Sequence, residues 1–129
     1  MNRKALFYPF FSLLIVALAL SACGGSKQSV FPSGKFIKSG ETNYGLEFKS
    51  DGAFQVFQGA TVFVHGTYKV EGDTLTETSN DGGCKTNISF KYSFDGQNLT
   101  LKYADNPDDD ADCTGRYADF NNVTYTLAK

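Results

Sequence analysis

Apolar and polar residues alternate with a period of two along much of the chain, and this pattern limits the folds open to it. Successive side chains of a β-strand point to opposite faces, so such alternation indicates strands with one buried face. The apolar positions are Leu46, Phe48, Phe54, Val56, Val62, Val64, Tyr68, Val70, Ile88, Phe90, Tyr92, Phe94, Leu99, Leu101, Tyr103, Val123, Tyr125 and Leu127. Beyond the N-terminal segment we find no apolar stripe of helical spacing, so an all-β fold is predicted.

Turn-forming pairs separate the alternating segments. These pairs tolerate the positive φ angles of tight hairpins, and they are Asp51-Gly52, Gly72-Asp73, Asp95-Gly96 and Asn121-Asn122. Each interval between them has room for two strands and a connection. We therefore expect the tight turns at one end of an up-and-down antiparallel meander, and at the other end the connections at residues 58–61, 80–86 and 104–116.

With residues 34–39 as the first, the chain has about eight predicted strands. Such a set hides its apolar face either by closing into a barrel, which also removes both exposed edges, or by folding into two packed layers. Short consecutive connections favour the barrel. At eight strands, the interior of a barrel is filled by side chains or holds one small ligand.

The N-terminal segment has the layout of a secretory signal, with two basic residues before an apolar run at residues 5–20. A membrane-spanning helix needs about 20 apolar residues, whereas this run is shorter and contains Pro9. Leu20-Ser21-Ala22-Cys23 resembles the lipobox of bacterial lipoproteins, and Gly24-Gly25-Ser26 resembles the flexible tether that follows it.

This resemblance implies that the Cys23 sulfur carries a diacylglyceryl group and that cleavage makes Cys23 the first residue of the exported chain. A single acyl chain gives only marginal attachment, so a stable anchor takes at least two. The chain then divides into a signal helix at residues 1–22, a lipidated cysteine and tether at residues 23–33, and a domain at residues 34–129. We expect this domain at the cell membrane or the outer membrane, facing the periplasm or the outside. A secreted protein with a chance cysteine is the alternative.

Cys84 and Cys113 remain as a pair once Cys23 is assigned to lipid. Export into an oxidising compartment favours a disulfide between them. Two free thiols are the alternative. A bridge closing a loop of this length would contribute roughly 3–4 kcal/mol to stability in the chain-entropy description.

Acidic residues outnumber basic ones, with 14 Asp and Glu against 12 Lys and Arg. Removal of the signal takes two of the basic residues with it, so no basic patch remains. Proteins bind phosphate backbones through clustered Lys and Arg. We therefore expect no nucleic-acid partner.

Two sequence stretches and the strand rhythm resemble small lipocalin-like, calycin-type barrels of bacterial lipoproteins. The stretches are GTYKVEGDTLTET at Gly66–Thr78 and FDGQNLTLKY at Phe94–Tyr103. Gly34-Lys35-Phe36 stands where lipocalins have Gly-x-Trp, and Arg116 resembles the arginine that stacks on that ring. The resemblance implies a binding role, with an interior pocket for a small apolar molecule.

Inward-facing aromatic residues are the candidate lining of such a pocket. They are equally explained as a packed core, because large rings fill a small barrel quickly. The candidates are Phe48, Phe54, Tyr68, Phe90, Tyr92, Tyr103 and Tyr125. Other aromatic residues lie at outward-facing strand positions or in connections. We expect them to be exposed, or to form the mouth of the pocket or a surface patch that binds a partner. They are Tyr44, Phe57, Phe63, Tyr117 and Phe120.

Catalytic signatures are weak. His65 is the only histidine, and its parity places it outside the barrel, away from any nucleophile it would have to activate. Glu47 and Glu77 are isolated, and Glu77 is read as the end of a strand. The chain has no recognised metal, phosphate or dinucleotide motif. We expect neither an enzyme nor a cofactor.

The loop at residues 105–112 is the one acidic cluster. Asp108, Asp110 and Asp112, with Asp119 at the twelfth place, partly match the spacing of a calcium loop. The sixth place, where such loops need Gly, is Cys113. A solvated acidic loop is therefore favoured over a calcium site.

The sequence thus predicts an exported, lipid-anchored, monomeric β-barrel that contacts the membrane through Cys23. Its expected role is non-enzymatic binding of a small apolar or amphipathic ligand. The alternative is a cell-surface structural or protein-interaction module with a filled core and an envelope protein as partner. Interior volume distinguishes the two, because pockets for small molecules measure about 300–1,000 Å³.

Overall fold

The computed structural model describes residues 30–81, 84, 87–111 and 113–129. The predicted signal, the lipidation site at Cys23 and the calcium candidate Asp112 lie outside the described residues.

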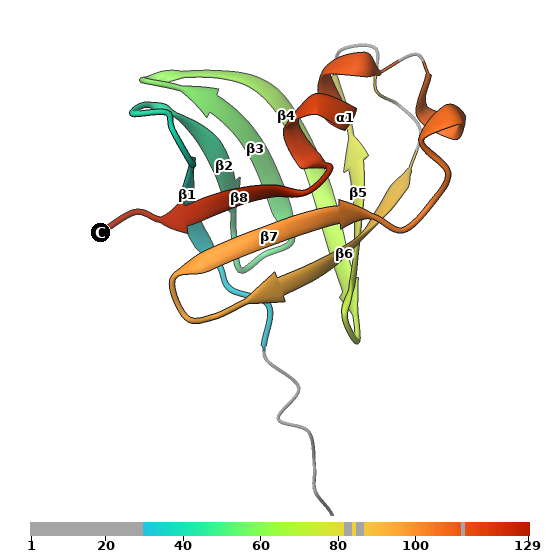
Figure 1. Cartoon of the computed structure of the whole chain (residues 1–129). Helices are drawn as coiled ribbons and strands as arrows, with labels where there is room; N and C mark the ends of the chain where they lie inside the picture. Colours follow the sequence, from blue (N-terminus) through green and yellow to red (C-terminus); the bar gives the residue numbers. More distant parts are fainter. Residues whose placement is uncertain (1–29, 82–83, 85–86, 112) are drawn as a thin grey trace, which may run out of the picture.

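The chain folds into eight antiparallel strands that form a closed barrel in sequence order (Figure 1). Each strand pairs with the next, and β8 closes the barrel against β1. The all-β meander and its closure are therefore confirmed. The strands are β1 (Gly34–Lys38), β2 (Tyr44–Phe48), β3 (Ala53–Gln58), β4 (Thr61–Glu71), β5 (Thr74–Ser79), β6 (Ile88–Phe94), β7 (Asn98–Tyr103) and β8 (Val123–Leu127).

Three of the four expected hairpins lie at one end of the barrel, which we call the turn end. Gly52, Gly72 and Gly96 take positive φ angles of 88°, 62° and 101° there. The placement of Asn121-Asn122 with them is wrong. Asn122 does have a positive φ of 59°, but it precedes β8 at the opposite end, because one long connection joins β7 to β8.

That connection carries two short helices, the 3₁₀-helix η1 (Pro107–Asp110) and the α-helix α1 (Thr114–Phe120). No helix was predicted in this connection, so α1 is an addition to the expected all-β fold. A helix of seven residues is shorter than the window over which a 3.6-residue period can be recognised. In Figure 1, α1 lies over the end of the barrel opposite the turn end, and we call this the helix end.

Alternating side chains from every strand fill the middle of the barrel, as expected for this strand number. The rings pack edge to face or tilted, at centroid distances of 6.2 Å for Phe36–Phe48 and 5.3 Å for Phe48–Phe54. Such pairs stabilise a core beyond the area they bury. The core side chains with at most 1% exposure are Phe36, Leu46, Phe48, Phe54, Leu75, Ile88, Phe90, Leu99, Leu101 and Tyr125.

A residue of the predicted tether closes the turn end. The Phe31 ring lies 4.9 Å from the ring centroids of Phe48 and Tyr92 and 5.4 Å from that of Tyr68. The segment ahead of β1 therefore takes part in the packing of the barrel from Phe31 onward. Val30, immediately before it, is exposed.

Two aromatic residues expected at the surface are buried instead. Phe120, the last residue of α1, is 3% exposed and stacks on Phe90 at 5.1 Å, so it closes the helix end. Phe57 packs over Gly45 on the outer face. A Cβ atom at Gly45 would lie 3.0 Å from Phe57 Cζ and 2.0 Å from the Phe36 carbonyl oxygen, so a larger residue would not fit there. A β-bulge between Val56 and Phe57 and the missing Gly45 side chain explain this position.

Candidate functional site

Glu77 projects from β5 into the helix end of the barrel and is fully buried. The alternation of β5 continues through Leu75, Glu77 and Ser79, which are all buried. Reading Glu77 as a strand end was therefore wrong. Burial of an unpaired carboxylate is costly, so the position requires a partner from another element.

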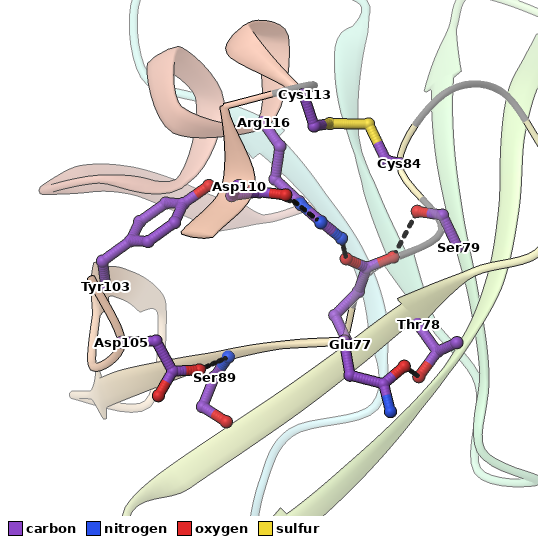
Figure 2. Close-up of polar contacts among 11 residues, drawn as sticks. Glu77, Thr78, Ser79, Cys84, Ser89, Tyr103, Asp105, Asp110, Cys113 and Arg116 are labelled. Carbon is purple, nitrogen blue, oxygen red and sulfur yellow. Dashed lines mark hydrogen bonds and ion pairs between the residues drawn. A yellow bond between two sulfur atoms is a disulfide. The ribbon is translucent and has the colours of Figure 1, made fainter. Parts of the chain in front are cut away.

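Arg116 of α1 supplies that partner, as Figure 2 shows. Its Nη1 donates to Glu77 Oε2 at 2.5 Å. Its Nε donates to Asp110 Oδ2 at 2.7 Å, and Nη2 donates to Asp110 Oδ1, which makes a bidentate pair. Charge-assisted bidentate pairs are the strong class of protein hydrogen bonds. The contacts join β5, η1 and α1 through one guanidinium.

Two hydroxyl groups complete the network. Ser79 Oγ donates to Glu77 Oε1 at 2.5 Å, and the Tyr103 hydroxyl donates to Asp110 Oδ2 at 2.8 Å. In Figure 2 the Tyr103 ring points toward Asp110. Among the described residues, no buried side-chain nitrogen or oxygen lacks a hydrogen-bond partner. We call Glu77, Ser79, Tyr103, Asp110 and Arg116 the buried network.

Burial sets the electrostatics of the network. It raises the pKa of Glu77, although the Ser79 hydroxyl and the Arg116 charge act in the opposite direction. Burial also raises the pKa of Tyr103, and the neighbouring Asp110 carboxylate adds to the effect. For Arg116, burial acts to lower the pKa, but the bonds and charges of Asp110 and Glu77 outweigh it and the pKa is raised. Arg116 is therefore a fixed cation.

A disulfide holds α1 beside the network. Cys84 and Cys113 are bonded, with their Cα atoms 5.2 Å apart, and this confirms the predicted pair. Cys113 directly precedes α1, whereas Cys84 lies between β5 and β6. The bridge spans a sequence separation of 29 residues. Figure 2 shows it next to Arg116.

A half-open cavity of about 270 Å³ lies above the buried network at the helix end. Its walls are mostly apolar and aromatic, and its polar groups come from the buried network, α1 and the Tyr44 hydroxyl of β2. The lining residues are Tyr44, Phe54, Val56, Phe63, Val64, Glu77, Ser79, Cys84, Cys113, Gly115, Arg116, Asp119 and Phe120. Glu77 and Arg116 are almost completely shielded from bulk solvent, so they form the buried, charged floor of the cavity.

Tyr44, Phe63 and Asp119 line the cavity and are half-buried or exposed, and we call them, together with the adjacent Lys38, the mouth of the cavity. Asp119 Oδ2 accepts from the Tyr44 hydroxyl at 2.5 Å, and Oδ1 accepts from Lys38 Nζ at 2.8 Å. The Tyr44 ring stacks on Phe63 at 6.0 Å, and Phe63 is 47% exposed. The Asp119 backbone carbonyl accepts from the Tyr125 hydroxyl at 2.7 Å, so the core fixes the position of this carboxylate.

The expected pocket residues are distributed over three regions. Of the seven aromatic candidates, Phe54 lines the cavity. Phe48, Phe90, Tyr103 and Tyr125 are buried in the core, and Tyr68 and Tyr92 pack around Phe31 at the turn end.

The other expected site residues are placed as follows. His65 is exposed, and its Nδ1 lies 2.8 Å from Asp81 Oδ2. Glu47 is half-buried next to Lys35 across the β1–β2 pair. Of the calcium candidates, Asp108 is exposed, whereas both Asp110 oxygens are engaged by Arg116 and Tyr103. In the part of the chain that the structure describes, no three His, Cys, Asp or Glu side chains gather as a metal site would require.

The lipocalin resemblance led us to expect Arg116 on the ring of Phe36, and this is wrong. The Phe36 ring packs on Phe48 and Phe94, while the Arg116 guanidinium lies between Glu77 and Asp110. Because Glu77 places a charge inside the barrel, the arginine is drawn to it. The one sequence feature that could have indicated the network is the position of Glu77, which shares the inward face of β5 with Leu75.

Comparison with known proteins adds no relatives: no family model matches the chain, and no curated protein or solved structure does either. Among the helices of the described residues, none is both long and apolar enough to cross a membrane.

Proposed function

We propose that this protein is a non-enzymatic envelope lipoprotein that binds a small amphipathic molecule at the helix end of its barrel. The observation that carries the proposal is the cavity of about 270 Å³, with aromatic walls above a charged floor. Ligand sites in proteins combine apolar walls with a few placed polar groups in the same way. The volume lies near the lower limit of about 300 Å³ for such sites, which indicates a compact ligand.

The filled interior supports a ligand site at the rim and not along the barrel axis. Phe31 occupies the turn end, and Phe120 occupies the helix end below the cavity. A lipocalin-like role in this chain would therefore use the space between α1 and the ends of β2–β5. The ligand would first contact Phe63 and Gly115, which are the exposed lining residues, and then the half-buried Tyr44 and Val64.

A binding role also agrees with the chemistry of the lining. Two hydroxyl groups of the lining lie beside carboxylates, but neither carboxylate is free. Ser79 contacts Glu77, which is bound to Arg116, and Tyr44 contacts Asp119, which is bound to Lys38. The single histidine lies on the outer face against Asp81. Nucleophilic catalysis needs an accessible nucleophile with a free base, and these positions do not provide one.

Native mass spectrometry of the full chain, purified from its own host in mild detergent, tests the binding proposal. We expect a co-purifying small molecule that is lost in Val64→Trp, because the indole fills the cavity. Thr67→Trp, on the exposed face of the same strand, is the matched control and should keep the molecule. A wild-type protein without any bound molecule, together with no binding in ligand screens, would contradict the proposal.

Lipid attachment has its own test. Cells that express the protein and receive labelled palmitate should incorporate label into the wild type but not into Cys23→Ala. The double variant Cys84→Ser/Cys113→Ser should remain labelled, since these sulfurs are bonded to each other. Equal labelling of wild type and Cys23→Ala would refute the anchor.

A protein-interaction role is the second candidate, and two exposed rings favour it. Phe63 and Tyr117, at 47% and 44% exposure, both lie at the helix end. Aromatic residues are enriched in the centres of protein interfaces. Crosslinking in intact cells should capture an envelope protein with the wild type and lose it in Phe63→Ser/Tyr117→Ser if this role is correct.

A further inference from the structure

The ammonium group of Lys38 contacts two residues that line the cavity, Asp119 and Tyr44. Lys38 Nζ lies 2.8 Å from Asp119 Oδ1 and 5.5 Å from the centroid of the Tyr44 ring. The side chains of Lys38 and Asp119 are each 25% exposed, so the ion pair is partly shielded from water. A carboxylate beside an aromatic face is an arrangement that proteins use to bind organic cations.

We propose that this mouth recognises small organic ammonium ions with an apolar body, and that Lys38 is a tethered occupant which such a ligand displaces. The inference rests on the proposed function, because it names the ligand class of the same cavity.

The charge around the cavity favours a cation. The lining residues Glu77, Arg116 and Asp119 and their ion-pair partners Asp110 and Lys38 comprise three acidic and two basic side chains. One negative charge therefore stays uncompensated even with Lys38 in place. Within a partly desolvated site, such an excess attracts cations and repels anions.

The Tyr44 hydroxyl is affected by both burial and the neighbouring acidic groups. Burial raises its pKa, and the hydrogen bond and charge of Asp119 and the charge of Glu41 raise it further. Glu41 thus adds to the negative potential at the mouth.

The geometry leaves a position for the ligand ammonium. Tyr44 holds Asp119 Oδ2, and Tyr125 holds the Asp119 backbone carbonyl, so the carboxylate stays in place when Lys38 leaves. Asp119 Oδ1 is then open to a new donor. An apolar body attached to that ammonium would lie along Phe63 and Val64 toward the buried wall.

Isothermal titration of the full chain with three matched probes tests the inference. The probes are 2-phenylethylammonium, 2-phenylethanol and 3-phenylpropanoate, which share an apolar body and differ in charge. We expect the wild type to bind the ammonium most tightly. Lys38→Met should raise the ammonium affinity about tenfold if Lys38 leaves the site free roughly a tenth of the time, while the alcohol affinity stays unchanged.

Two further variants separate this effect from general changes in charge. Lys91→Met also removes a lysine paired with an aspartate, since Lys91 Nζ lies 2.7 Å from Asp73 at the turn end. It should leave the affinity for every probe unchanged. Asp119→Asn should weaken ammonium binding at least about tenfold, as expected for loss of a charge-assisted contact, and should remove the preference over the alcohol.

The outcomes distinguish the two proposals. Equal affinities for the ammonium and the alcohol, or tighter binding of 3-phenylpropanoate, would overturn the ligand class and leave the binding role intact. Binding of no probe by the wild type and Lys38→Met, with both folded by circular dichroism, would overturn both. If Lys38→Met does not fold, Lys38→Gln takes its place under the same criteria.

Discussion

Glu77 occupies a position where the alternation of β5 calls for an apolar side chain. The barrel accommodates its charge only because Arg116 reaches in from α1, and Arg116 in turn is held by Asp110. Removing one member of a buried ion network leaves the others uncompensated, which costs more than the network contributes as a whole. At the residue scale, the members of the network therefore differ in how well their loss is tolerated.

Arg116→Met should be the most destabilising change in the network. It leaves two buried carboxylates without a cation, and a loss of about 3–5 kcal/mol in the free energy of unfolding is expected. Glu77→Gln keeps the Arg116–Asp110 pair and should cost clearly less. Urea denaturation measures both, and a Glu77→Gln loss as large as that of Arg116→Met would contradict this account.

Glu77 should also give the stability a pH dependence of known sign. Burial raises its pKa in the folded protein above the usual value of 4.5. The folded state therefore holds the proton more tightly than the unfolded state, and the stabilisation is complete below pH 4.5 and lost as pH rises through the folded pKa. Relative to Glu77→Gln, the wild type should gain stability as the pH falls from 7 toward 4.5. Denaturation curves at several pH values should show this, and a relative loss would be inconsistent with it.

At the scale of elements, α1 depends on tertiary contacts. Helices this short are not stable alone in water, and α1 is held by the disulfide, Arg116 and Phe120. The sequence did not reveal α1 because its partners Glu77, Cys84 and Phe90 lie far from it in the chain, and no periodic pattern indicates such contacts.

Loss of the disulfide should loosen α1 more than the strands. Cys84→Ser/Cys113→Ser is expected to cost roughly 3–4 kcal/mol in global stability. In hydrogen exchange, the Arg116 and Asn121 amides, which donate to Cys113 and Tyr117 carbonyls, should lose protection first. The amides of β2 and β3 serve as the internal reference. Uniform loss of protection would argue against a local role of the bridge.

A pair of glycines offers a sharper test of strand packing. Gly45→Ala should destabilise the barrel by more than about 1 kcal/mol, because its Cβ would stand 2.0 Å from the Phe36 carbonyl oxygen. Gly115→Ala in α1 meets nothing within 4 Å and should be neutral or stabilising by up to about 1 kcal/mol. Thermal melts of both variants measure the difference, and similar melting temperatures would refute the explanation.

At the scale of the molecule, alternation and turn residues were enough to predict the closed barrel, since both are local signals and short connections between consecutive strands favour closure over two packed layers. The candidate site could not be predicted in the same way. Lys38 and Asp119 are 81 residues apart, and Glu77 and Arg116 are 39 apart. Both pairs form only because the long connection between β7 and β8 packs against the end of the barrel. A local sequence pattern does not predict such packing.

Phe31 links the N-terminal segment to the barrel. It was predicted to be part of the flexible tether, but its ring packs against the core. Phe31→Ala should cost somewhat less than the ~3–5 kcal/mol typical of a fully buried phenylalanine, since it packs on Phe48, Tyr68 and Tyr92 from one end only. Val30→Ala, at an 89% exposed position, should have little effect. Chemical denaturation measures the stability of both variants. If Phe31→Ala is as stable as Val30→Ala, the packing of Phe31 does not contribute to stability.

The entry of the chain at the turn end also has a geometric consequence. With lipid on Cys23, as we propose, the stretch from there to Phe31 reaches at most about 30 Å, and Phe31 is pinned at the end opposite α1. The bilayer would then lie beneath the hairpins, and the opening between α1 and the strand ends would look outward. Such a molecule would sample solutes arriving from the aqueous side, and it would not draw lipids from the leaflet that holds it.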